Sequence, residues 1–191
     1  MIKVISIDHP QVVNYAVNIL KKGGVIVYPT DTLYGFGADA TDDGAIDKIN
    51  RIKGRSGPMS VIAANNNMAV DWMNITCEQL EITKPHLGGS QTLIVPVKDN
   101  IVSSKILGEK NTLGVRIPKN TFCNELSLQF DKPIISTSVN RTNEQPMNDP
   151  IKIESEFSSE INLLIDAGTL PKSKGSTIYQ LKENKIIILR T

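Results

Sequence analysis

The chain has 191 residues, near the usual size of one domain, so a single domain over residues 1–191 is predicted. Hydrophobic residues make up 40% and charged residues 21%, the balance of an ordinary globular protein. A formal net charge of +1 argues against a surface coated with positive charge for non-specific binding of nucleic acid.

Targeting and redox features are sparse. The N-terminal sequence MIKVISIDHP lacks the apolar segment of a secretory signal, and no apolar run is long enough to span a bilayer. A cytoplasmic protein without membrane contact is expected. Cys77 and Cys123 are too few and too distant for a disulfide framework or a CxxC metal site, and are expected to be buried free thiols.

The N-terminal half predicts strands alternating with helices. A helix begins near Pro10 and ends at the glycine pair Gly23-Gly24, and the next helix is capped by Asp42 or Asp43. Between them, the β-rich run 25–28 predicts a buried strand, and 30–37 is expected to be a turn rich in hydroxyls and glycine. Further strands are expected at 3–7 and 59–63, with two short helices over 65–85.

The C-terminal half is richer in strands. Candidate strands lie at 92–97, 112–117, 133–138, 163–166, 176–181 and 186–190, and a helix is expected over 121–130. This order of elements indicates an α/β or α+β domain.

Four places suggest a site rather than scaffold. They are the turn after residue 28, the basic tripeptide Lys53-Gly54-Arg55, the polar segment 136–142, and Arg190 at the end of an apolar strand. Lysine and arginine can hold a phosphate chain, and polar residues two apart on a strand share one face. Each place also has an ordinary explanation: a loop, a basic helix end, Asx or Ser turns, and a solvated tail.

Several chemistries have no support in the sequence. There is no GxxxxGK[ST] loop, no GxGxxG, no zinc-ligand cluster and no GxSxG. No set of metal ligands or tightly bound cofactor is therefore predicted. An enzyme with this sequence is expected to work by positioning and electrostatics.

Taken in order, these motifs resemble the YrdC-like family of threonylcarbamoyl-adenylate synthases. The matching segments cover nearly the whole chain, and in chain order they are GGVIVYPTDTLYGFGADATDD, Lys53-Gly54-Arg55, TLGVRIP, Ser138-Val139-Asn140, GSTI and the closing ILR. The resemblance implies a twisted mixed β-sheet curved around a large concave basic cavity, with helices outside. Longer relatives carry an additional C-terminal domain, and this chain resembles the single-domain form.

The resemblance also implies roles for residues. Thr32, Arg116, Ser138 and Ser176 would contact L-threonine or its carbamate. ATP would be held by Lys53, Arg55, Thr112, Asn140, Asn148 and Arg190, and the first two would also be catalytic. The implied enzyme is a nucleotidyltransferase that uses ATP with Mg²⁺, L-threonine and bicarbonate. It would supply a separate tRNA threonylcarbamoyl transferase, and weak tRNA binding is possible.

The sequence departs from the family pattern in one wall of the expected site. Only Ser56-Gly57 separates Arg55 from Pro58, and Ile62 stands where relatives often have histidine. Two other readings remain. One is a module that binds tRNA or double-stranded RNA without turnover, which an aromatic content of 5% does not favour. The other is a relative that uses carbamoyl phosphate, which is disfavoured because such proteins carry zinc-finger-like and transferase regions that 191 residues cannot accommodate.

Overall fold

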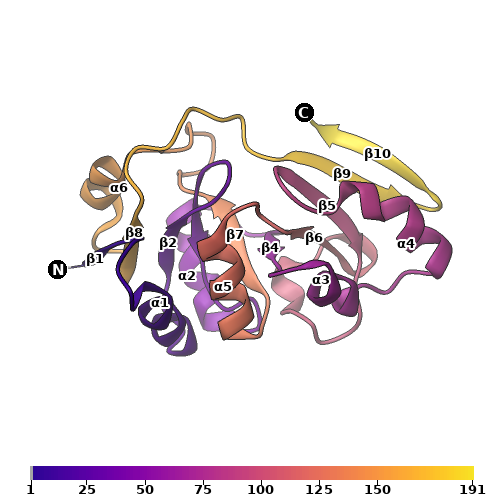
Figure 1. Ribbon diagram of the computed structural model, residues 1–191, viewed down its shortest axis with the longest axis horizontal. Helices are drawn as coiled ribbons and strands as arrows, with labels where there is room; N and C mark the ends of the chain where they lie inside the picture. Colours follow the sequence, from indigo (N-terminus) through magenta and orange to yellow (C-terminus); the bar gives the residue numbers. More distant parts are fainter. Residues whose placement is uncertain (1) are drawn as a thin grey trace.

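A computed structural model of the protein describes residues 2–191, and in this range a single sheet runs through the whole molecule (Figure 1). Its ten strands follow the order β1-β8-β2-β3-β7-β4-β6-β5-β9-β10. Their bounds are β1 Lys3–Ser6, β2 Ile26–Pro29, β3 Tyr34–Gly37, β4 Ser60–Ile62, β5 Gln91–Pro96, β6 Thr112–Arg116, β7 Ile134–Ser138, β8 Leu163–Asp166, β9 Thr177–Lys182 and β10 Lys185–Arg190.

The sheet is mixed, as predicted. Strands β1 and β2 both pair in parallel with β8, and the pairs β4–β6 and β5–β9 are also parallel. The remaining neighbours are antiparallel, including the tight β2–β3 and β9–β10 hairpins. Strands distant in sequence therefore lie side by side near the middle of the sheet.

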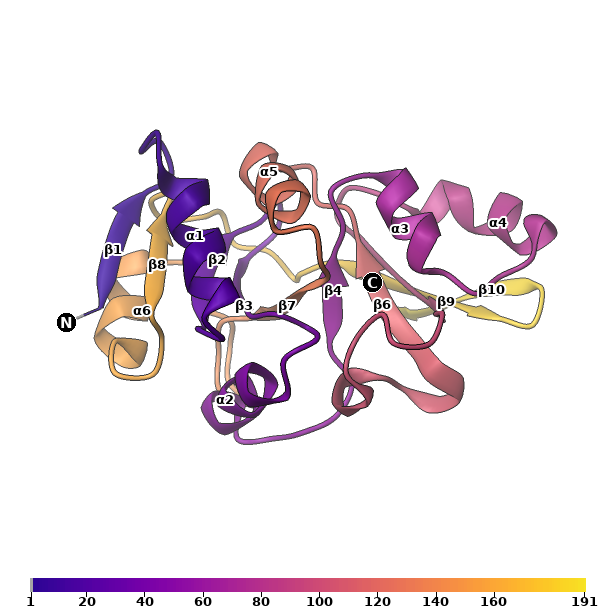
Figure 2. The same cartoon turned by 90° about the horizontal axis from the view of Figure 1, so that it is seen from below.

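Helices cover both faces of the sheet. Figure 2 shows α1, α5, α3 and α4 along one side and α2 and α6 on the other. The α-helices are α1 Val12–Lys21, α2 Asp43–Lys53, α3 Asn66–Trp72, α4 Cys77–Thr83, α5 Thr121–Phe130 and α6 Pro150–Phe157. Three 3₁₀ turns lie at Lys84–His86, Ser104–Ile106 and Glu109–Asn111.

Two apolar clusters fill the space between helices and sheet. One joins α1 and α5 to the strand residues Tyr28 and Ile62. The other joins α2 and α6 to the opposite face, where the rings of Phe36 and Phe157 meet edge-on at 5.2 Å. Burial of the helix stripes predicted from apolar spacing accounts for both layers.

The structure corrects three expectations. The turn expected over 30–37 ends at residue 33, because Tyr34–Gly37 forms β3 against β2. Packing requires glycine at position 37 of this strand, because a Cβ on Gly37 would lie 2.6 Å from Cε1 of Tyr28. Helix α6, which follows the N-cap Asp149, was not predicted. Cys123 is buried as expected, but Cys77 is exposed at the start of α4.

Two features near the C-terminus shape the functional site. Residues 167–176, here called the strap, join β8 to β9 without regular structure and cross the top of the molecule in Figure 1. Strand β10 contains a bulge: Ile188 pairs with Tyr179 and Arg190 with Ile178, so Leu189 is an extra residue. Among the described residues, no helix is both long and apolar enough to cross a membrane.

Candidate functional site

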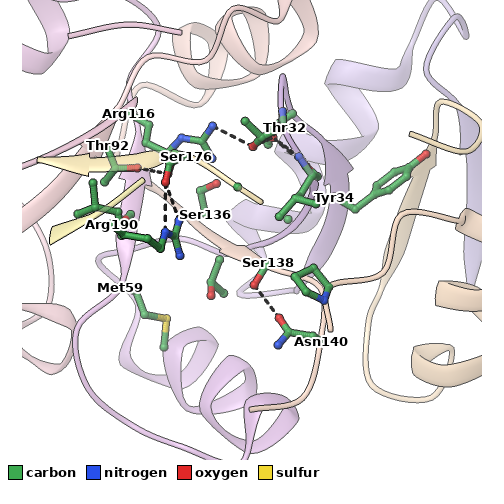
Figure 3. A pocket seen from close by; sticks show the side chains of 18 of the residues that line it. Thr32, Tyr34, Met59, Thr92, Arg116, Ser136, Ser138, Asn140, Ser176 and Arg190 are labelled. Carbon is green, nitrogen blue, oxygen red and sulfur yellow. Dashed lines mark hydrogen bonds between the residues drawn. The ribbon is translucent and has the colours of Figure 1, made fainter. Parts of the chain in front are cut away.

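A polar cavity of about 360 Å³ lies where the middle strands meet the strap (Figure 3). Its walls come from the β2–β3 turn, the end of α2, strands β4 to β7, the strap and the last two strands. A cavity of this size suits a small-molecule ligand. Hydroxyl groups dominate the lining, contributed by Thr30, Thr32, Ser60, Thr92, Ser136, Thr137, Ser138, Thr142 and Ser176.

The cavity is strongly cationic. Its basic lining residues are Lys53, Arg55, Arg116, Lys174 and Arg190, and within the described chain no aspartate or glutamate lines it. A net charge of +1 for the whole chain therefore conceals a marked local excess of positive charge. Such an arrangement favours anions, because closely spaced cations with few counter-ions gain most from a negatively charged ligand.

Lys53 is the best-defined cation of the cavity. It ends α2, where Gly54 takes the left-handed conformation (φ 67°) and turns the chain toward Arg55. The side chain is only 4% exposed, and its Nζ donates to the Ser138 carbonyl and to Asn140 Oδ1, both at 2.8 Å. Burial, helped by repulsion from Arg55, lowers the Lys53 pKa to about 8.

Asn140 is held in one orientation by four hydrogen bonds. Its Oδ1 accepts from Lys53 and, at 2.6 Å, from the Ser138 hydroxyl. Its Nδ2 donates to the carbonyls of Arg141 and Glu144. The segment after β7 therefore fixes the place of the lysine ammonium, and the predicted Ser-x-Asn pattern puts both side chains on one wall.

Arg116 forms the centre of a second group. Its Nη2 donates to Asp31 Oδ1 at 2.9 Å and to the Thr32 hydroxyl at 3.2 Å, and both charged side chains are 9% exposed. Asp31 also accepts from the Lys119 backbone amide, and Thr32 shares a hydrogen bond with Thr30. Arg116 Nε is buried with no partner among the described groups.

Arg190 and Ser176 connect the strap to the edge of the sheet. Ser176 Oγ lies 2.7 Å from the Thr92 hydroxyl, and its carbonyl accepts from Arg190 Nη2 at 2.8 Å. Arg190 reaches the cavity because the bulge at Leu189 pairs it with Ile178, another lining residue. An arginine at the end of an apolar strand is thus part of a wall rather than a solvated tail.

The structure brings together most residues that the resemblance assigned, and leaves two apart. Eight line the cavity: Thr32, Lys53, Arg55, Arg116, Ser138, Asn140, Ser176 and Arg190. Thr112 is outside the lining set, and its hydroxyl donates to the Glu109 carbonyl. Asn148 is also outside it, because its Nδ2 donates to the Leu170 carbonyl of the strap at 2.6 Å.

Other site residues escaped the sequence analysis. Asp31, Thr92, Ser60 and Lys174 were assigned no role, although the first lies inside the quoted turn motif and the others at strand ends or in the strap. Ile62, which replaces a frequent histidine, is buried against the α1–α5 layer and does not line the cavity. Ser60, on the same strand, supplies the polar group there.

The cavity does not fit a metal held by the protein. Over residues 2–191, no group of three or more histidine, cysteine, aspartate or glutamate side chains is placed to hold an ion. Divalent cations such as Mg²⁺ prefer carboxylate and phosphate oxygens. A metal in this cavity would therefore have to enter with the phosphates of a ligand.

The mixed sheet and its basic, hydroxyl-lined cavity define a domain suited to a small anionic ligand. Comparison with known proteins places this domain more narrowly. The Sua5/YciO/YrdC family model, described as "telomere recombination", matches residues 18–191. The chain belongs to this family.

Solved structures agree with that placement. E. coli YciO superposes with a TM-score of 0.87 at 26% identity, over 100% of this chain and 94% of that one. P. abyssi Sua5 in complex with L-threonine gives 0.87 at 25% identity, and this chain spans 57% of that protein. Full-length HypF in a phosphate- and nucleotide-bound form, 18% identical with a TM-score of 0.78 over 93% of this chain and 28% of HypF, shares the fold.

Proposed function

We propose that this protein is a nucleotidyltransferase that makes L-threonylcarbamoyladenylate from L-threonine, bicarbonate and ATP, with release of pyrophosphate. One observation carries the proposal: an arginine–hydroxyl group and a lysine–arginine group share one cavity whose described lining includes no carboxylate. The first suits an amino acid, and the second suits a triphosphate. The threonine complex of P. abyssi Sua5 supports threonine as the amino acid.

The threonine end is assigned to Arg116, Thr32, Ser138 and Ser176. Arg116 lines the cavity and can pair with a ligand carboxylate beside its bonds to Asp31 and Thr32. Asp31 fixes the guanidinium, so little side-chain freedom is lost on binding. The surrounding hydroxyls can bond the amine, the hydroxyl or the carbamate of threonine. A site that bonds the threonine hydroxyl rejects 2-aminobutyrate, which lacks it.

The phosphate end is assigned to Lys53, Arg55 and Arg190, with Asn140 holding the lysine in place. In the first step, the threonine nitrogen bonds to the carbon of bicarbonate, and water and a proton leave. A carbamate oxygen then attacks the α-phosphorus of ATP. The bond to the bridging oxygen breaks, and pyrophosphate leaves with the electron pair. The cations offset negative charge that accumulates on the phosphates in this step.

Mg²⁺ would accompany ATP as its phosphate complex, because the described residues offer no carboxylate ligand set. The product is a mixed anhydride suited to acyl transfer. We assign its use to a separate transferase that modifies a tRNA adenosine. Direct binding of tRNA by this protein is the alternative, and it needs no nucleotide turnover.

The decisive measurement is pyrophosphate release from ATP by the purified protein with Mg²⁺ and bicarbonate, with and without L-threonine. Release that depends on both co-substrates is expected. Lys53→Ala should lower it by about 100-fold or more, since a buried cation beside the phosphates is lost. Arg51→Ala is the matched control: Arg51 is an exposed cation on the same helix and does not line the cavity.

Folded protein that releases no pyrophosphate in response to threonine would contradict the proposal. Salt-dependent binding of tRNA by that same protein would then favour the RNA-binding alternative. Equal activity with 2-aminobutyrate would leave the synthase intact but refute recognition of the threonine hydroxyl.

A further inference from the structure

Arg141 follows the site residue Asn140, but it does not line the cavity. Its side chain binds behind the cavity wall, between the end of α2 and helix α6. Nη1 donates to the carbonyl of Ile52 at 3.0 Å, and Nη2 donates to Glu160 at 2.7 Å. Nε donates to Glu156 at 3.3 Å, and the guanidinium lies 5.1 Å from the ring centroid of Phe157.

The Arg141 backbone lies in the same junction. Its carbonyl accepts from Asn140 Nδ2 at 2.7 Å, which sets the orientation of that amide. The next amide, that of Thr142, donates to the carbonyl of Lys53 at 3.1 Å. Side-chain and backbone contacts thus join the loop after β7 to the last turn of α2 at two successive carbonyls, those of Ile52 and Lys53.

These contacts bear directly on the geometry inside the cavity. Lys53 comes from α2 and Asn140 from the loop, and their 2.8 Å hydrogen bond exists only while the two elements keep their relative place. Arg141 is the side chain that links them from outside. Glu156 in α6 and Glu160 just after it extend the link to this helix, whose Phe157 is part of the core.

We infer that Arg141 is a positioning residue for the phosphate end of the cavity, with Glu156 and Glu160 as its supports. The inference rests on the proposed function for the identity of the ligand, ATP. A bidentate guanidinium can satisfy a helix carbonyl and two carboxylates together, whereas a lysine ammonium is a single point charge. Exposed ion pairs stabilise proteins weakly, so the main effect is expected on ligand affinity rather than on folding.

The test is titration of ATP, with Mg²⁺ present, into the full chain by calorimetry, which needs no turnover. Arg141→Lys should weaken ATP binding by about tenfold, because a displaced Lys53–Asn140 pair meets the phosphates poorly. Affinity for L-threonine should fall less than affinity for ATP, because Arg116 and Thr32 lie outside the displaced group and only Ser138 is bonded to Asn140. The neutral variants Glu156→Gln and Glu160→Gln should weaken ATP binding in the same direction by about threefold.

Lys105→Ala is the matched control. It removes a 2.7 Å ion pair between Lys105 and Asp47, and Asp47 lies on the outer side of α2. It should leave ATP affinity unchanged. Unchanged ATP affinity in folded Arg141→Lys and in both glutamine variants would overturn the inference, as would an equal loss for ATP and threonine. If Arg141→Lys does not fold, the glutamine variants decide. Wild-type protein that binds ATP without releasing pyrophosphate would refute the proposed synthase alone.

Discussion

At the residue scale, Lys53 combines burial with a function that requires charge. Its pKa is lowered from 10.5 to about 8, chiefly by burial, so the ammonium loses its proton within an accessible pH range. Bound phosphates favour the protonated form and raise the pKa again. Nucleotide binding and protonation of Lys53 are therefore linked.

This linkage predicts the direction in which ATP affinity changes with pH. Affinity for ATP should be highest below the Lys53 pKa and fall as pH rises through about 8. The loss should reach roughly tenfold between about pH 7 and about pH 9, since the protonated fraction falls by that factor. Titration of ATP across this range measures it. In Lys53→Arg the decline should disappear, because a guanidinium does not titrate there; an unchanged profile would exclude Lys53 as its source.

The sequence alone predicted a role for some of these residues but not for others. Lys53 and Arg55 were visible as a basic helix end, but that pattern alone did not distinguish a phosphate site from capping. Asp31 was quoted within a motif without a role, because nothing in the sequence places it 2.9 Å from Arg116, 85 positions away. Pairing at that sequence distance is a tertiary property.

At the element scale, hydrogen bonds to the rest of the domain hold both ends of the strap, and fewer hold its middle. Near its start, the Tyr34 hydroxyl accepts from the Ala167 amide and donates to the Gly168 carbonyl. Leu170 is bonded on both sides by Asn148, through the backbone carbonyl and Nδ2. At the far end, Ser176 is fixed by Thr92 and Arg190. Asn148, assigned to ATP by resemblance, is thus placed to act through the strap.

Trypsin measures this directly, because Lys172 and Lys174 are exposed in the strap. Asn148→Ala removes one anchoring bond and should speed cleavage at these lysines about fivefold, for a hydrogen bond worth about 1 kcal/mol. Tyr34→Phe removes two and should speed cleavage further. Tyr15→Phe, on the exposed side of α1, is the control. Wild-type cleavage rates in Asn148→Ala would show that this side chain does not hold the strap.

Elements were predictable where apolar spacing was regular. Helices α1, α2 and α5 and the apolar strands lie where the pattern put them, because each buries the stripe that the pattern records. Strand β3 was missed because its Gly35 and Gly37 resemble turn residues, yet the Tyr28 ring next to Gly37 leaves no room for a side chain. Helix α6 was missed because its eight residues are too few to show a clear apolar period.

At the scale of the whole molecule, the sheet order gathers cations that the sequence scatters. Lys53, Arg116 and Arg190 come from α2, β6 and β10, and only the order of the strands makes them neighbours. Periodicity does not encode that order, and the resemblance predicted the mixed sheet and basic cavity without giving the strand order. Collecting like charges in one cavity also costs stability in the absence of a ligand, since their repulsion is unrelieved.

A polyanion should therefore stabilise the fold. Pyrophosphate at about 100 times its dissociation constant should add about 2.7 kcal/mol, or roughly 5–10 °C in Tm for a domain of this size. Thermal denaturation with pyrophosphate, against sodium chloride at equal ionic strength, measures the gain. Lys53→Ala should reduce it and Arg51→Ala should not. Equal shifts in the two variants would mean that pyrophosphate binds elsewhere.

The bulge in β10 decides which side chain of this strand lines the edge of the cavity. Side chains on a strand alternate, so the residue opposite Ile178 shares the face of the sheet that lines the site. With Leu189 as the extra residue, that place belongs to Arg190; in an unbroken strand it would belong to Leu189. The bulge thus sets the register of β10 against β9. The same sequence paired without the bulge would exchange a cationic wall for an apolar one.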